Sequence, residues 1–261
     1  MACMPNFCAV ERDGYLRIIR IERPEAMNAL HATAIAELSR VFDEYEADDD
    51  AWVAILTAAG DRAFCVGNDL RHPAGSADEW RLPESGFGGL TARFDMVKPV
   101  IAAVNGIAAG GGFELALACD LIVAAEHAQF TLPEVKLGLA ALAGGVHRLP
   151  RSIGVHRAMG IVLTGRRVSA QEGLQLGFVN EVVAANELMA AARRWADAIL
   201  AASPMSVRAS KQAMLSGLDL AGVRAATKAS YPAVDALLRS EDLQEGPRAF
   251  LEKRQPVWKG R

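Results

Sequence analysis

The chain has 261 residues, 51% of them hydrophobic, so it can build a sizeable core and is not disordered as a whole. Its formal net charge of −3, from 28 basic and 31 acidic residues, excludes the basic surface expected of a protein that binds nucleic acid or an anionic membrane. The length is ordinary for one domain, and we expect residues 1–261 to form a single domain.

Cysteine usage and the N-terminal sequence predict a cytoplasmic protein. The four cysteines form no CxxC pair and accompany no paired histidines, which favours reduced thiols. The N-terminal residues lack the basic patch and apolar run of a signal peptide. The apolar stretch 100–125 is long enough to cross a bilayer, but Asn105, Glu114 and Asp120 interrupt it, so we expect buried soluble structure.

Strand and helix patterns alternate in the first part of the chain. Tyr15–Pro24 and Trp52–Ala58 are β-rich runs, closed by a proline and by a glycine turn. A helix is predicted between them, from about Ala29 to Tyr45. Its apolar face has three-and-four spacing and consists of Leu30, Ile35, Leu38, Val41, Phe42 and Tyr45.

The central segments predict an α/β fold. Arg71–Gly89, rich in Gly, Pro and Ser, is predicted to be a mobile loop. Val100–Gly106 is a predicted buried strand, Gly111–Cys119 a short helix and Asp120–Glu126 a further strand. Strands that alternate with helices indicate α/β layering.

The last third of the chain is predicted to be helical. SAQE, starting at Ser169, is a capping-box pattern, and helical runs follow at about 187–202, 204–217 and 219–239. No flexible linker separates the parts. We expect a mixed core to about residue 195 and a helical region over about 196–261.

The stretch NGIAAGGGFELALACD, residues 105–120, carries three glycines two residues before Glu114. It matches neither GxGxxG nor a P-loop, and the chain has no GxSxG elbow and no HExxH or similar histidine set. Glycines at a helix start expose backbone N–H groups that bind anions, and one such donor aimed at an oxyanion is worth roughly 3 kcal/mol. The alternative is that the glycines only permit close packing of helix and strand.

Two glutamates are candidate acid–base groups. Glu114 stands among apolar residues, where an ionised carboxylate is costly unless it faces a partner or a polar cavity; the alternative is a surface position. Glu134 follows Pro133 directly after a predicted strand, and its alternative is a solvated loop position. Together they suit addition of water to a double bond, in which one group deprotonates water and the other gives a proton to carbon.

Four motifs resemble the crotonase superfamily, also called the enoyl-CoA hydratase/isomerase family, in the family's order and approximate spacing. They cover the chain from about Tyr15 onward: RPEAMNAL (23–30), AFCVGNDL (63–70), KPVIAAVNGIAAGGGFELALACD (98–120) and LPEVKLGLAALAGGVHRLPR (132–151). The resemblance implies a crotonase-like ββα spiral core with a helical C-terminal trimerisation region, in a homotrimer or a hexamer of paired trimers.

The resemblance also implies the site. The backbone N–H groups of Asn68 and Gly111 would form an oxyanion hole for the thioester of an acyl-CoA substrate. Glu114 would activate water, and Glu134 would exchange the proton on the α-carbon. Having both glutamates favours a hydratase or dehydratase over an isomerase, and no metal or redox cofactor is implied; coenzyme A is part of the substrate.

Further positions are implied to bind the CoA thioester. Phe250 and Lys253, in AFLEKR, would reach the acyl chain and the CoA phosphate from a neighbouring subunit. The adenine pocket would use backbone around four residues, Ala26, Met27, Asp69 and Leu70. An RNA-binding protein on the same fold is the alternative from another class, and the low basic charge argues against it.

Departures from the family pattern bear on the substrate. Alanine is commonest where this chain has Asn68, and AALAGG (140–145) replaces the frequent IPGAGG. GGFGGLTARF and the C-terminal sequence most resemble family members whose acyl group carries a trimethylammonium. Trp80, Glu84 and Phe87 are candidates for an aromatic or acidic cage around that cation, against the alternative of a plain solvated loop.

Overall fold

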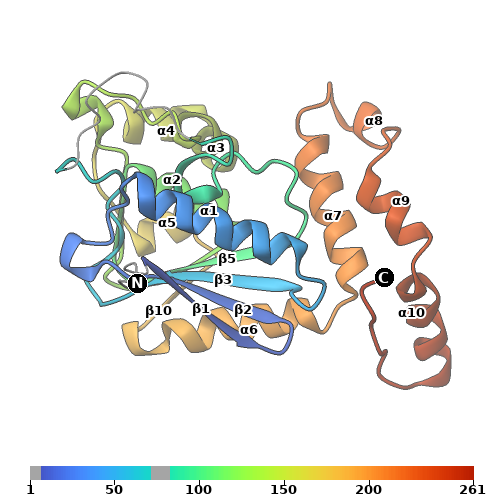
Figure 1. The fold of residues 1–261 in the computed structure, drawn as a ribbon. Helices are drawn as coiled ribbons and strands as arrows, with labels where there is room; N and C mark the ends of the chain where they lie inside the picture. The colour runs from blue at the N-terminus through green and yellow to red at the C-terminus, as the bar shows by residue number, and fades with distance from the viewer. Residues whose placement is uncertain (1–6, 72–82) are drawn as a thin grey trace.

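In a computed structural model of the chain, which describes residues 7–71 and 83–261, two β-sheets are covered by helices (Figure 1). The strands of the larger sheet, in spatial order, are β1 (Cys8–Asp13), β2 (Leu16–Ile21), β3 (Val53–Ala58), β5 (Val100–Val104), β7 (Leu121–Ala125) and β10 (Glu181–Val183). Those of the smaller sheet are β4 (Ala63–Cys65), β6 (Ile107–Ala109), β8 (Gln129–Thr131) and β9 (Val168–Ser169).

The helices follow the strands in the order that the sequence predicts. The α-helices are α1 (Ala32–Ala47), α2 (Gly111–Ala118), α3 (Gly145–Ile153), α4 (Val155–Val162), α5 (Ala170–Leu176), α6 (Leu188–Leu200), α7 (Pro204–Gly217), α8 (Val223–Ala226), α9 (Pro232–Leu238) and α10 (Glu241–Glu252). Short 3-10 helices are η1 (Pro24–Ala26), η3 (Phe87–Gly89), η4 (Glu134–Leu137) and η5 (Ala185–Glu187).

From β3 to β8, successive strands alternate between the two sheets, which confirms the predicted crotonase-like spiral. β3, β5 and β7 are parallel neighbours in the larger sheet, and each is followed in sequence by a strand of the smaller one. Those following strands, β4, β6 and β8, are parallel neighbours too. Their carboxyl ends therefore share one sheet edge, and the loops that leave this edge carry Asn68, Gly111 and Glu134.

The central strands of the larger sheet are buried on both faces, so alternate residues of a strand enter two different cores. In β3, Leu56 packs in the core that includes α1, whereas Ile55 packs in the core that includes α6. Figure 1 shows α1 and α6 on opposite sides of this sheet. Burial on both faces explains why the central strands read as continuous apolar runs.

Helix α1 buries the predicted apolar face but begins three residues later than predicted. His31 is the N-cap, and its Nδ1 accepts a hydrogen bond from the Ala34 N–H at 3.2 Å. The preceding residues are held elsewhere, because Asn28 is left-handed with φ 55° and Leu30 forms a bridge with Asn68. The buried face consists of Ala34, Ile35, Leu38, Val41, Phe42 and Tyr45.

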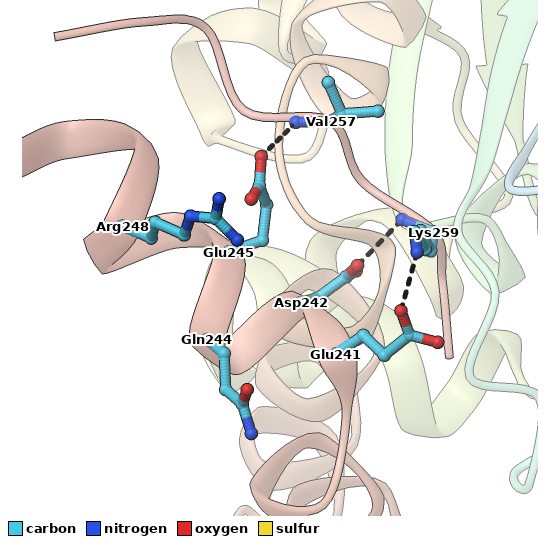
Figure 2. Close-up of a pocket in the computed structure, with 7 residues that line it drawn as sticks. All are labelled: Glu241, Asp242, Gln244, Glu245, Arg248, Val257 and Lys259. Carbon is cyan, nitrogen blue, oxygen red and sulfur yellow. Dashed lines mark hydrogen bonds and ion pairs between the residues drawn. The ribbon is translucent and has the colours of Figure 1, made fainter. Parts of the chain in front are cut away.

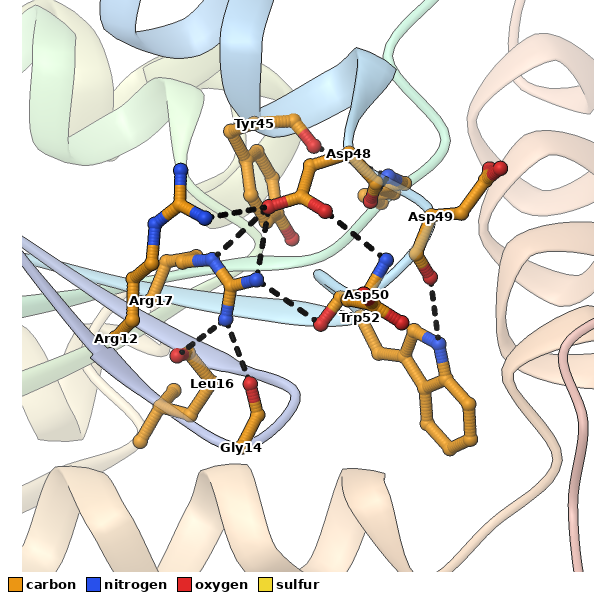
Figure 3. Close-up of polar contacts among 10 residues, drawn as sticks. Arg12, Gly14, Leu16, Arg17, Tyr45, Asp48, Asp49, Asp50 and Trp52 are labelled. Atoms are coloured by element: carbon orange, nitrogen blue, oxygen red, sulfur yellow. Dashed lines mark hydrogen bonds and ion pairs between the residues drawn. The ribbon is translucent and has the colours of Figure 1, made fainter.

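A buried polar cluster fixes the C-terminal end of α1 against the sheet (Figure 3). The Arg17 guanidinium, in β2, donates to Asp48 at 2.8 Å and to the carbonyl oxygens of Gly14, Leu16 and Asp50. Lys98 is also buried, and its Nζ donates to the Asp48 carbonyl at 2.7 Å. Each buried cation thus has acceptors that offset its lost hydration.

Three local predictions differ from the structure. Strand β1 has no predicted counterpart, because this edge strand is mostly exposed and lacks an apolar alternation. The run predicted at 219–239 is divided into α8 and α9, since Gly222 adopts φ 99° and Pro232 starts a new helix. Helix α10 lies beyond the predicted runs. The Ser169 half of the SAQE capping box is confirmed, since the Ser169 hydroxyl accepts from the Glu172 N–H, whereas the Glu172 carboxylate accepts from Arg166.

Helices α7 to α10 form an arm that extends from the sheets (Figure 1). The final residues of the chain run back along α10, where the buried Asp242 accepts hydrogen bonds from the N–H groups of Lys259 and Gly260 (Figure 2). The Ser203 hydroxyl, at the start of α7, donates to the same carboxylate at 2.8 Å. Within residues 7–71 and 83–261, no helix is long and apolar enough to span a bilayer.

Candidate functional site

The loop after β4 presents the backbone N–H of Asn68 at the edge shared by the small-sheet strands. The Leu30 N–H donates to the Gly67 carbonyl at 2.9 Å, and the Asp69 N–H donates to the Leu30 carbonyl at 3.0 Å. These bonds use the residues on either side of Asn68. In the described part of the chain, the Asn68 N–H itself has no acceptor.

Gly111 brings a second unpaired amide to the same place. It is the first residue of α2, where a helical N–H has no partner within its helix, and none is found among residues 7–71 and 83–261. A Cβ atom at Gly67 would lie 3.1 Å from the Gly111 nitrogen. The loop of Asn68 and the start of α2 are therefore in contact, as an oxyanion hole requires.

Each of the three consecutive glycines permits a different close approach. A Cβ at Gly110, which has φ 54°, would lie 2.8 Å from the Oε1 atom of Glu134. At Gly111 it would lie 2.8 Å from the Phe87 ring, and at Gly112 it would overlap the Cys65 carbonyl oxygen. The glycines therefore do permit close packing, as the alternative explanation requires. The same packing brings the unpaired N–H of Gly111 close to Glu114 and Glu134.

Glu114 is buried, so its alternative as a surface residue is wrong. It lies in the first turn of α2, is 3% exposed, and its Oε1 accepts a hydrogen bond from the Gly145 N–H at 2.8 Å. Burial, together with the nearby charge of Glu134, raises the pKa of Glu114 to about 7. The carboxyl group is therefore able to exchange a proton near neutral pH.

Glu134 lies beside the start of α2, as the contact of its Oε1 with Gly110 shows, and it is not a solvated loop residue. Its Oε2 atom is buried and has no hydrogen-bond partner in the described ranges. Burial raises the pKa of this carboxyl as well. A buried acceptor without a partner is unusual, and it suits a group that acts on a bound ligand.

Two asparagines that support the site were missed as functional residues. The Asn28 side-chain amide donates to the carbonyls of Ala59 and Ala63, and that of Asn105 donates to those of Ala58 and Gly60. Both hold the turn that leads into β4 and on to Asn68. Their sequence signal is an amide within an otherwise apolar segment.

The positions implied for adenine binding lie close to the Asn68 loop. Ala26 ends η1 and Met27 follows in a left-handed conformation with φ 54°. Arg23, just before this turn, forms a buried ion pair of 3.1 Å with Asp69, which brings the two segments together. Leu70 follows Asp69 and is 53% exposed.

Other implied positions are not brought to the site within one chain. Phe250, 82% exposed, lies on α10, and Lys253 is the C-cap of this helix, in the arm. Of the three residues considered for a cationic cage, Trp80 lies outside the described residues and Glu84 is exposed. Phe87 belongs to η3, is 3% exposed and packs against Gly111, so its assignment to a mobile loop is wrong.

Across the described ranges, no three His, Cys, Asp or Glu side chains are grouped to hold a metal ion.

Comparison with known proteins extends over nearly the whole chain. The profile of the family described as enoyl-CoA hydratase/isomerase matches residues 11–261. Carnitinyl-CoA dehydratase of Proteus mirabilis is 45% identical over 257 residues, which cover 96% of this chain and 97% of that protein.

Solved structures give the same similarity. The enoyl-CoA hydratase from Mycobacterium marinum has a TM-score of 0.91 at 38% identity and covers 98% of this chain and 100% of its own. The carnitinyl-CoA hydratase from Mycobacterium avium has a TM-score of 0.75 at 41% identity, with coverage of 99% and 100%.

Proposed function

The chain belongs to the enoyl-CoA hydratase/isomerase family as a hydro-lyase, and we propose that it adds water to a 2-enoyl-CoA thioester or removes it from the hydrated product. The observation that carries this proposal is the position of two carboxyl groups, that of the buried Glu114 and that of the half-buried Glu134, around a helix start with an unpaired N–H at Gly111. Both carboxyl groups have raised pKa values, which suits acid–base catalysis near neutral pH.

The two unpaired amides would hold the thioester oxygen. As water adds to the β-carbon, negative charge develops on this oxygen, and the N–H groups of Asn68 and Gly111 stabilise it. Fixed donors of this kind contribute roughly 3 kcal/mol each, because they need no reorganisation during the reaction. The Asn68 side chain does not affect this role, since any residue other than proline supplies the N–H.

The two carboxyl groups would divide the proton transfers. In hydration, ionised Glu114 takes a proton from water as the water oxygen bonds to the β-carbon. Protonated Glu134 gives its proton to the α-carbon, so one water is added and one proton has moved from Glu134 to Glu114. Dehydration uses the reverse steps, so both directions require one proton on the pair. No cofactor takes part; coenzyme A is a portion of the substrate.

Replacing either carboxyl group tests this assignment. We expect Glu114→Gln and Glu134→Gln each to lower kcat for crotonyl-CoA hydration by about 10²- to 10⁴-fold, the usual range for general acid–base groups. Binding of CoA, measured by calorimetry, should persist in both variants. Glu126→Gln, at an exposed position, is the matched control and should keep the parent rate. Hydration by Glu134→Gln at the parent rate would show that the assignment is wrong.

The relatives suggest a more specific substrate. The proteins at 45% and 41% identity are named carnitinyl-CoA dehydratase and carnitinyl-CoA hydratase, so crotonobetainyl-CoA is a second candidate substrate. Of the candidates for a cage around its trimethylammonium group, Phe87 packs beside Gly111 and Glu84 is exposed. Turnover of crotonobetainyl-CoA and crotonyl-CoA at equal concentration decides between the candidates, and a shifted double bond in the product would instead identify an isomerase.

We also propose a homotrimer or hexamer in which neighbouring chains complete the CoA site. Phe250 and Lys253 lie on the arm and are exposed, as expected of side chains that contact a second copy. The adenine group of CoA would bind between η1 and the Asn68 loop, in contact with the backbone of four residues, Ala26, Met27, Asp69 and Leu70. RNA binding stays a remote alternative, because the net charge of −3 offers little attraction for phosphates.

A cytoplasmic location stays a prediction. It is supported by the free thiols of Cys8, Cys65 and Cys119, since such thiols are usual in a reducing compartment.

A further inference from the structure

Arg148, on α3, is a half-buried cation that the proposed mechanism does not use. Within the described residues, no carboxylate lies within 4 Å of its guanidinium, so it forms no ion pair. Its Nη2 donates to the Thr91 carbonyl at 2.9 Å, and its Cζ lies 5.2 Å from the centre of the Phe94 ring. A desolvated cation without a counter-ion is costly, so its position needs an explanation.

The guanidinium lies across the turn that orients Glu114. A Cβ atom at Gly144 would overlap the Nη1 atom of Arg148, and Gly144 is left-handed with φ 113°. The next residue, Gly145, donates its N–H to the Glu114 carboxylate. Arg148 thus packs on one residue of the turn while the following residue binds the catalytic candidate.

The charges around Glu114 are few and of both signs. Glu134, on η4, raises the pKa of Glu114, and Arg148, on α3, lowers it. Around Arg148 itself, the groups that act are Glu114, Cys119 at the end of α2, and Arg151 one turn further along α3. Arg148 is therefore the cation placed to oppose Glu134 at the Glu114 carboxyl.

We propose that Arg148 is a positioning residue for Glu114: it holds the Gly144–Gly145 turn and supplies the positive charge that balances Glu134. The part that concerns catalysis rests on the proposed function, because it requires Glu114 to act on the substrate. The geometric part, the coupling of Arg148 to Glu114, does not depend on the reaction.

Neutral variants of Arg148 should shift the pH profile of hydration. Because one proton must remain on the glutamate pair, kcat/KM falls as pH rises through the pKa of Glu114, about 7. Arg148→Gln removes the positive charge, so the pKa of Glu114 rises and the alkaline limb of kcat/KM should move to higher pH by about half a unit. This shift is smaller than the one expected between two charges in direct contact. Arg148→Lys keeps the positive charge and should leave the alkaline limb at the parent's pH, although it loses the contacts made by the planar guanidinium.

Two further variants keep the test decisive. Arg148→Met keeps a long unbranched side chain without the charge and replaces the Gln variant if that variant does not fold. Arg151→Gln removes an exposed charge from the same helix and should leave the limb in place. An unchanged limb in both neutral variants would overturn the proposal, as would equal shifts in Arg148→Gln and Arg151→Gln.

A direct titration separates this proposal from the proposed function. The carboxyl band of Glu114, followed by infrared spectroscopy with ¹³C-labelled glutamate and assigned with Glu114→Gln, should titrate at higher pH in Arg148→Gln than in the parent. This result is expected even if the parent hydrates no enoyl-CoA, in which case the proposed function fails and the coupling stands. An unshifted band contradicts the coupling whatever the activity.

Discussion

At the scale of single residues, Gly112 shows how tightly the site is assembled. A methyl group there would overlap the Cys65 carbonyl oxygen at the end of β4, so α2 and β4 would have to separate. We expect Gly112→Ala to lower stability by about 1–3 kcal/mol, the usual cost of overpacking, and to lower kcat further because Gly111 moves with the helix. Thermal unfolding and crotonyl-CoA hydration measure the two effects.

Gly160 provides the matched control. It lies within α4, and a Cβ there meets nothing within 4 Å. Gly160→Ala should raise stability by about 0.5–1 kcal/mol, because alanine loses less conformational entropy in a helix, and should leave kcat unchanged. Equal losses of activity in the two variants would contradict the role assigned to the Gly112 contact.

At the scale of elements, two buried arginines, Arg23 and Arg17, each pair with an aspartate from a segment distant in sequence, and only one of the pairs lies at the site. Arg23 and Asp69 connect the turn after β2 to the Asn68 loop, and both side chains are at most 8% exposed. Asp69→Asn leaves Arg23 buried without its charge partner, which we expect to cost about 3 kcal/mol. It should also lower kcat, since the adjacent Asn68 amide loses its support.

Asp48→Asn is the comparison, because it removes the partner of the buried Arg17 far from the small-sheet edge (Figure 3). Asp48 is more exposed than Asp69, so a smaller loss of stability is expected, with kcat kept in the folded protein. Hydrogen bonds from Arg71 and, to a smaller extent, Arg23 lower the pKa of Asp69, and those from Arg17 lower the pKa of Asp48. The stabilisation from each pair is therefore present at neutral pH and is lost as pH falls below the ordinary aspartate range near 4. Loss of kcat in Asp48→Asn alone would reverse these assignments.

At the scale of the whole molecule, the arm carries large apolar side chains that the rest of the chain leaves exposed. Met214 and Leu218, at the end of α7, and Val223, at the start of α8, are each at least 66% exposed, and large exposed apolar side chains that gather in one region normally mark an interface. Asp242 accepts a hydrogen bond from Ser203, which holds α10 against the start of α7, and one from the Lys259 N–H, which holds the last residues against α10 (Figure 2). This surface suits contact with another copy of the chain.

Placing a charge on the arm tests the proposed assembly. If the parent is a trimer or hexamer, Leu218→Asp should release monomers in sedimentation velocity, because the carboxylate would be desolvated between copies. Ala36→Asp, which adds the same charge at an exposed position on α1, should keep the parent's assembly. A parent that sediments as a monomer would contradict the proposed homotrimer.

The sequence by itself determined the features that depend on neighbours along the chain. The apolar face of α1, the buried central strands and the Ser169 cap were read from spacing within a few residues, and the motifs indicated the family. Edge strand β1 was missed for the same reason, since its exposed residues carry no periodic apolar signal. Local patterns report which side of an element is buried, but not what covers it.

Only the tertiary structure decided how the site residues meet. The Gly145 N–H binds Glu114, which is 31 positions away in the sequence, and Glu134 lies against Gly110. Phe87, which was predicted to lie in a mobile loop, packs on Gly111. These contacts arise because β4, β6 and β8 are parallel neighbours. Such pairing joins segments that are distant in sequence, and the sequence of one segment alone carries no pattern that predicts its neighbour. Burial, and with it the raised pKa of both glutamates, is a property of that assembled edge.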